Sequence, residues 1–165
     1  MKDLNSTDDN KVLKALEEAK TKGDVKWIRP LLYAFRDRKE DAIREQMREM
    51  LSTIKISDAE GIFIEELENK ESEVVWAEIL GFIWSCGFNP VDKLDLVTKV
   101  ATKGDFKAAM EGLTIVEQCE SVEEEQMLLE AIFNVRTAIE SNKDDALGKL
   151  YEPMLQALLK LERAQ

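Results

Sequence analysis

The stretch Glu71–Cys86, ESEVVWAEILGFIWSC, decides the fold, because as a helix it has more apolar surface than a single covered face can bury. Successive residues of an α-helix turn by about 100°, which places Glu78, Gly81 and Ser85 in one narrow stripe. Most of the remaining circumference is apolar, with Val75, Trp76, Ile79, Leu80, Phe82, Ile83, Trp84 and Cys86. A helix of this kind needs neighbours on both flanks. We therefore predict that it is the middle of a stacked helical array.

Composition extends the helical prediction to the whole chain. The 165 residues include only seven Gly and three Pro, and no segment alternates as a strand would, so we predict an all-α fold without a sheet. Pro30 lies inside the second helix, which predicts a tight first turn before a regular helix near Arg29, or a kink. The apolar spacing predicts about nine helices: one that ends at Gly23, then about 24–35, 40–54, 58–69, 71–86, 90–102, 105–119 and 122–141, and a last one from Asp144 or Asp145.

An internal repeat relates the odd-numbered helices. A shift of 33 residues aligns three sets of apolar positions, and a shift of 31 extends the register back to the first helix. Cys86 and Cys119 fall in the same register, so we interpret both as buried packing residues rather than redox or metal groups. The aligned sets are Ile43, Trp76 and Ala109; Met47, Leu80 and Leu113; and Met50, Ile83 and Val116.

One junction in the first half carries a family resemblance. GDVKWIRPLL at Gly23–Leu32, followed by KEDAIREQMREML at Lys39–Leu51, resembles the junction between helix pairs in HEAT-like repeat proteins. The resemblance implies a right-handed α-α superhelix, a HEAT-like solenoid, used as a scaffold for protein binding. Enzymes of that family, such as alkylpurine DNA glycosylases and phycobilin lyases, are a minority. After Gly87 only the periodicity continues.

Length and charge set further expectations. We expect a flexible polar tail over residues 1–8 and a single domain over 9–165. No apolar run is long enough to cross a membrane, and the N-terminus lacks the apolar core of a secretory signal, so we expect a cytoplasmic protein. The net charge of −11 disfavours nucleic acid and anionic membranes as partners. We expect a monomer or weak homodimer that binds a protein or peptide.

No residue pattern indicates catalysis. The chain has no histidine, and its glycines are isolated, which leaves no phosphate-binding loop. The acidic cluster of Glu65, Glu66 and Glu68 is explained by a solvated helix face, and we expect Glu78 to be exposed as well. We therefore predict a protein that is not an enzyme and uses no cofactor and no metal.

Charge is uneven along the chain. The segment 26–48 holds seven basic residues against four acidic ones, whereas 58–78 holds eight acidic residues against Lys70 alone. Binding to a basic or amphipathic segment would use carboxylates that flank apolar positions on the even-numbered helices. The candidate contacts are Glu65, Asp92 and Asp95 on the acidic side, and Arg36, Arg38 and Arg44 in the basic segment.

Two other functions stay open. A nucleic-acid-binding or DNA-repair-like protein of the same fold would use the basic segment 26–48. A lyase-like helper would hold a small molecule between helices, where Trp27, Trp76 or Trp84 could line a pocket. Intrahelical ion pairs would explain the charge pattern without any partner.

Overall fold

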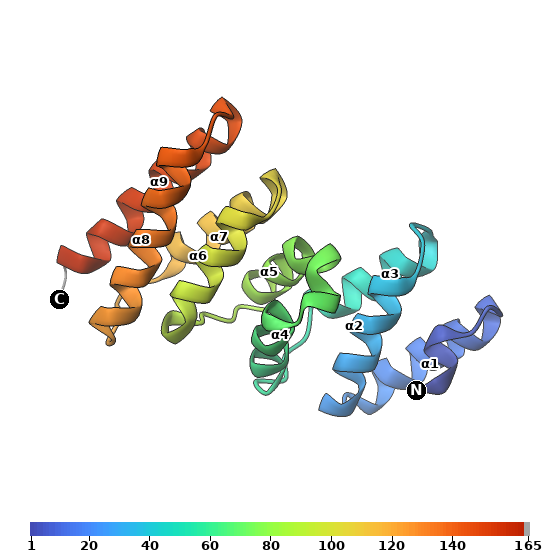
Figure 1. Cartoon of the computed structure of the whole chain (residues 1–165). Coiled ribbons are helices and arrows are strands. Elements are labelled where there is room, and N and C mark those ends of the chain that lie inside the picture. The colour runs from blue at the N-terminus through green and yellow to red at the C-terminus, as the bar shows by residue number, and fades with distance from the viewer. Residues whose placement is uncertain (164–165) are drawn as a thin grey trace. The chain divides into compact units, whose positions relative to one another are not determined.

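The computed structural model describes residues 1–163, which are helical nearly throughout (Figure 1). None of these residues forms a strand, which confirms the all-α prediction. Four short 3-10 helices occur as well: η1 (Lys2–Asn5), η2 (Val25–Trp27), η3 (Lys70–Val75) and η4 (Val91–Lys93). The nine α-helices of the described range are α1 (Asp9–Lys22), α2 (Ile28–Asp37), α3 (Ala42–Ser52), α4 (Ala59–Glu68), α5 (Trp76–Ser85), α6 (Leu94–Lys103), α7 (Phe106–Gln118), α8 (Glu125–Ser141) and α9 (Asp145–Arg163).

The chain divides into two compact units, Met1–Ile62 and a second that begins at Phe63. In the first unit, α1 and α2 both pack against α3. In the second unit α5, α7 and α9 form one layer, while α6 and α8 form another that lies in front of α7 and α9 in Figure 1. The prediction of a single domain over residues 9–165 stays a prediction. No helix of the described range is both long and apolar enough to span a membrane.

Side-chain caps fix where several helices begin. The carboxylate of Asp8 accepts a hydrogen bond from the amide of Asn10 at the start of α1. Asp24 and Asp105, the first residues of the helices expected over about 24–35 and 105–119, cap the next elements in the same way. Each carboxylate accepts a hydrogen bond from an otherwise unpaired amide and lies near the positive end of the helix dipole.

The start of α2 confirms the prediction of a tight first turn. The 3-10 helix η2 precedes α2, and Pro30 is the third residue of α2. Proline is tolerated there because amides of the first helical turn have no intrahelical acceptor. Of the two alternatives that the sequence left open, the structure therefore agrees with the tight first turn.

The central stretch is less regular than predicted. Residues 70–75 form η3, and the α-helix begins only at Trp76. From there the apolar prediction holds for Ile79, Leu80 and Ile83, which have no exposed surface. Trp84 is 37% exposed, although we expected it to be covered. Helix α5 is therefore a largely buried helix with one aromatic edge in solvent.

Glu66 explains why η3 interrupts the expected helix. Its carboxylate, which we placed on a solvated face, is completely buried. The Ser72 hydroxyl and the Asn69 amide donate to its Oε2 atom at 2.6 and 3.0 Å. The indole of Trp76 donates to the Glu66 carbonyl oxygen at 3.0 Å. These bonds hold residues 69–76 back toward α4, which is the physical reason for the irregular start.

The repeat register coincides with the odd-numbered helices. The three aligned sets each have one member on α3, one on α5 and one on α7. Cys86 and Cys119 are both buried and unbridged, as predicted. Gly112 has a separate role: a Cβ atom there would lie 2.4 Å from the Cβ atom of Ala101. Glycine at this position lets α7 approach α6 closely.

The segment 1–8, for which we predicted a flexible tail, contains η1. Leu4 is only 2% exposed, and η1 packs against α1 and α2. A single leucine among polar residues gave no periodic signal. Its burial depends on an apolar surface that other helices provide.

Replacing a core residue of α5 tests whether the helix is covered as the structure indicates. Leu80→Ala or Ile83→Ala should lower the free energy of unfolding by roughly 2–5 kcal/mol, because each leaves a cavity. Urea titrations followed by circular dichroism measure the change. The matched control is Val74→Ala, since Val74 is 78% exposed. Equal stabilities of the three variants would contradict the burial of α5.

The hydrogen bond from Ser72 to Glu66 predicts a second stability effect. Ser72→Ala removes a donor to a buried carboxylate, and we expect a loss of about 1–3 kcal/mol. Ser141→Ala is the control, because the Ser141 hydroxyl bonds only the exposed end of α8. If both substitutions had the same small effect, the Glu66 carboxylate would not depend on Ser72.

Candidate functional site

One side-chain amide joins α6 to α8. The Asn134 Nδ2 atom donates to the Asp95 carbonyl oxygen at 3.0 Å and to the Thr98 hydroxyl at 3.3 Å. Thr98 is completely buried, and its hydroxyl donates to the Leu94 carbonyl oxygen. Because these bonds reach backbone atoms in the first turn of α6, they fix α8 beside the start of α6.

The starts of α6 and α8 form an open cleft of about 470 Å³, which we call the acidic cleft. From α6 and the preceding η4 come Asp92, Lys93 and Asp95; from α8 and its N-cap come Glu124, Glu125, Gln126, Met127 and Glu130. Two of the predicted contact residues, Asp92 and Asp95, are thus brought together.

The charge of the acidic cleft is strongly one-sided, with five carboxylates against the single ammonium group of Lys93. Carboxylates are favoured at helix N-termini because they compensate the positive end of the helix dipole. That preference explains why acidic residues occur in each first turn. Their sum in one cleft is a negative potential that attracts cationic groups and repels anionic ones.

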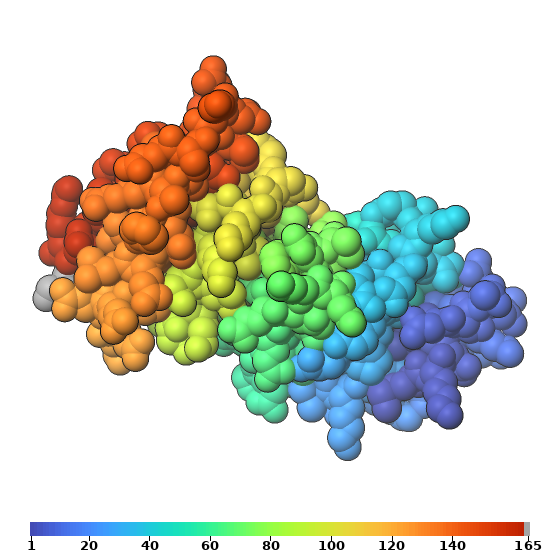
Figure 2. Space-filling model, viewed as in Figure 1, coloured from blue at the N-terminus to red at the C-terminus, as the bar shows by residue number. Residues whose placement is uncertain are grey.

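An exposed apolar pair lies on the outer face of α8. Phe133 is 68% exposed and Leu129 is 46% exposed, and the two are one helical turn apart. Gln126 and Glu130, which line the acidic cleft, precede each of them by three residues, so all four side chains lie on neighbouring ridges. Figure 2 shows α8, in orange, on the side that faces the viewer. The cleft therefore has an apolar ridge beside it.

The third predicted acidic residue, Glu65, does not join this cleft. It lies on α4, where its side chain is exposed, and it is not among the residues that line the cleft. The sequence placed the three carboxylates in one class because each flanks an apolar position. Only helix packing separates them.

The predicted basic residues are held by contacts within the first unit. Arg36 pairs with Asp37, and Arg38 pairs with Asp9 and Asp41. Hydrogen bonds from the Arg38 guanidinium lower the pKa of the Asp41 carboxyl group. These ion pairs reduce the positive potential that the segment 26–48 could offer to a partner.

Arg44 is buried, with 7% of its surface exposed. Its Nε atom donates to the Phe35 carbonyl oxygen at 2.8 Å, and its guanidinium lies over the Phe35 ring at 4.0 Å. Its Nη1 atom also pairs with Glu40. Arg44 thus ties α2 to α3, and its guanidinium is engaged on several sides.

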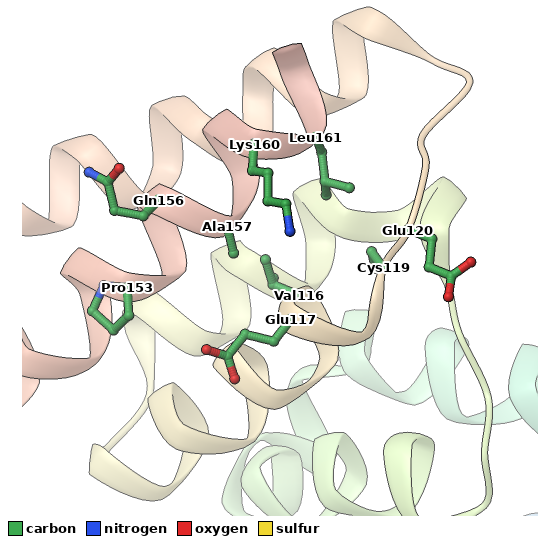
Figure 3. A pocket seen from close by; sticks show the side chains of 9 residues that line it. All are labelled: Val116, Glu117, Cys119, Glu120, Pro153, Gln156, Ala157, Lys160 and Leu161. Atoms are coloured by element: carbon green, nitrogen blue, oxygen red, sulfur yellow. The ribbon is translucent and has the colours of Figure 1, made fainter. Parts of the chain in front are cut away.

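The second unit has another groove, of about 820 Å³, between α7 and α9 (Figure 3). Val116, Pro153, Ala157 and Leu161 give it an apolar lining. In Figure 3 the Lys160 side chain extends from α9 toward α7, while the carboxylates of Glu117 and Glu120 point away. The charges at the rim are mixed, so this groove favours no one sign of ligand.

Cys119 is the thiol at this groove, and its surroundings make it a weak nucleophile. Burial raises its pKa to about 11, and its Sγ atom lies 3.2 Å from Oδ1 of Asn89. Nucleophilic attack requires the thiolate, which is scarce at neutral pH when the pKa is this high. The groove therefore offers no activated cysteine.

Contacts between α5 and α7 involve two acidic residues whose surroundings the sequence did not indicate. Glu111 is buried and accepts a hydrogen bond from the Trp84 indole. Its carboxylate lies over Gly81, where a Cβ atom would come within 3.3 Å. Glu78, expected to be exposed, is half-buried and pairs with Lys107 at 3.4 Å. Gly81 and Glu111 are thirty positions apart in the sequence, so no pattern within one helix indicates that they meet.

Comparison with known proteins gives no match for this chain: no protein-family model, no curated protein and no solved structure corresponds to it. Within the described part of the chain, no group of three or more cysteine, aspartate or glutamate side chains is arranged to hold a metal ion. The acidic cleft is therefore judged on its own geometry.

The raised pKa of Cys119 predicts its reactivity. At pH 8 a thiol with a pKa of about 11 has about a hundredfold less thiolate than one at the ordinary value of 9.0. Alkylation by iodoacetamide, followed by mass spectrometry, should therefore be slow and should still accelerate between pH 9 and 10. The chain unfolded in urea is the control.

The same shift affects stability. The folded state keeps the Cys119 proton between pH 9 and 11, whereas the unfolded thiol loses it, so stability should fall as pH rises through this window.

A folded-state alkylation rate that levels off near pH 9 would contradict the raised pKa.

Proposed function

We propose that this protein is a non-catalytic scaffold that binds a basic, amphipathic segment of a partner protein at the acidic cleft. The observation that carries the proposal is the exposed pair of Leu129 and Phe133 beside five carboxylates. Phenylalanine is common at protein interfaces, and a polar rim around an apolar centre is the usual arrangement there.

The carboxylates and the exposed apolar pair would contribute to binding in different ways. The negative potential of the cleft would attract lysine or arginine side chains and would speed the encounter at low salt. Apolar residues of the same segment would then cover Phe133 and Leu129, which removes apolar surface from water. A helical segment with basic and apolar residues on neighbouring faces satisfies both requirements.

The proposed architecture is a right-handed HEAT-like solenoid. Its support is the alternation of layers in the second unit, where consecutive helices pair and every second helix shares a layer. Stacks of helix pairs leave long outer faces open, and such faces serve as binding surfaces. The proposal includes a cytoplasmic protein that is a monomer or weak homodimer, because a net charge of −11 opposes self-association.

Paired serine substitutions test the apolar part of this site. Leu129→Ser with Phe133→Ser should weaken binding of a labelled lysine- and leucine-rich helical peptide by about tenfold or more. Fluorescence anisotropy measures the affinity, and a glutamate- and leucine-rich peptide of equal length should not bind. The fold of each variant is checked by circular dichroism.

Phe106→Ser with Met110→Ser is the matched control. These side chains are 50% and 42% exposed, have the same spacing, and lie on α7 near the end of α6 that is remote from the cleft. Asp92→Lys with Asp95→Lys tests the charge and should remove most of the salt dependence. Equal effects of the two serine pairs, or binding that survives the charge reversal, would reject the proposed site.

A further inference from the structure

A second candidate site lies entirely within the first unit. A pocket of about 330 Å³ is bounded by the end of α1, the start of α2 and the segment after α3. Its apolar lining includes Trp27, Ile28, Leu31, Met50, Ile54 and Ile56. Ligand pockets are commonly of this size and are largely apolar with a few polar groups.

A smaller hollow of about 150 Å³ lies beside this pocket, between α1 and α3. The two share Lys20, Met50 and Thr53, and the smaller one adds Leu13 and Leu16. We call the two hollows together the trough, with its wide end at Trp27 and its narrow end at Leu13. An elongated apolar molecule fits such a trough better than a compact one does.

The charged groups of the trough are unequal at its two ends. Lys55 lines the wide end alone, whereas Lys20 lines both hollows; within residues 1–163 neither ammonium group has an ion-pair or hydrogen-bond partner. The wide end also contains Asp24, whose carboxylate caps the next helix by accepting from the Lys26 amide. At the narrow end the charged side chains are Lys20, Glu17 and Glu49.

We infer that this trough binds a small amphiphilic carboxylate, with its anionic group between Lys20 and Lys55 and its apolar part against Trp27, Met50 and Ile54. A carboxylate would pair with two ammonium groups that have no other partner. A cationic amphiphile would meet like charges at the wide end. An uncharged one would gain only the apolar contacts.

Dodecanoate is the probe, and the indole signals of the full-length protein labelled with ¹⁵N report where it binds. Trp27 lines the trough, whereas Trp76 and Trp84 belong to the second unit and serve as internal references. Below its micelle concentration, dodecanoate should shift the Trp27 signal in a saturable way and leave the other two unchanged. Trp27→Phe assigns the signal.

Lys20→Gln with Lys55→Gln should weaken dodecanoate binding roughly three- to tenfold at low salt, since exposed ion pairs are individually weak. Lys11→Gln with Lys14→Gln, on the same α1 but outside the trough, is the charge-matched control and should change nothing. Dodecanol should bind the unmodified chain more weakly than dodecanoate does. Its affinity for the Lys20 and Lys55 variant should equal its affinity for the unmodified chain.

Four results would overturn the inference. One is the absence of a saturable Trp27 shift. Another is a shift shared equally by the three indoles, which indicates nonspecific adsorption. The third is equal affinity for dodecanol and dodecanoate with no effect of Lys20 and Lys55, which would leave an apolar hollow without selection for anions. An amphipathic peptide that displaces dodecanoate and binds more tightly would likewise reject a small carboxylate as the ligand.

Discussion

The buried carboxylate of Glu66 is the interaction on which the second unit depends. A carboxylate without surrounding water is tolerated only when donors satisfy it, and here Ser72 and Asn69 do so. Together with the Trp76 indole on the Glu66 carbonyl oxygen, these bonds determine where α5 begins and which way it faces. Helix α7 packs on α5, and α9 packs on α7. The direction of the layer is therefore set at its first helix.

The acidic cleft follows from the same packing. Asn134, in the middle of α8, bonds the first turn of α6, and the first turns of both helices, which each favour carboxylates, line one cleft. The carboxylates stabilise each helix separately, and their charges add up to one negative potential because the helices are neighbours. The exposed Leu129 and Phe133 add an apolar surface that the packing within the chain leaves largely uncovered.

The two candidate sites differ in charge and in depth. The acidic cleft is open and flanked by a ridge, which suits a protein segment. The trough of the first unit is lined by apolar side chains and has two lysines at its wide end, which suits a small anion with an apolar part. The net charge of the chain is −11, yet the two sites differ in local charge. The net charge therefore does not describe either site.

The sequence by itself determined the helical class, most helix positions and several caps. Apolar spacing and capping residues such as Asp24 and Asp105 act within one or two turns, so a linear reading captures them. It also marked Asp92 and Asp95 as candidate contact residues, because both flank apolar positions on an amphipathic helix, and both line the acidic cleft. These signals are local.

Only the tertiary structure decided which polar side chains are buried and which distant ones meet. Glu66 and Glu65 are adjacent in sequence, yet one is buried and the other is exposed, because hydrogen-bond donors from the following turns reach only Glu66. Arg44 was expected at a surface but lies over Phe35. The pairing of Asp95 with Asn134 spans 39 positions. Such contacts depend on helix packing, and no spacing within one helix encodes them.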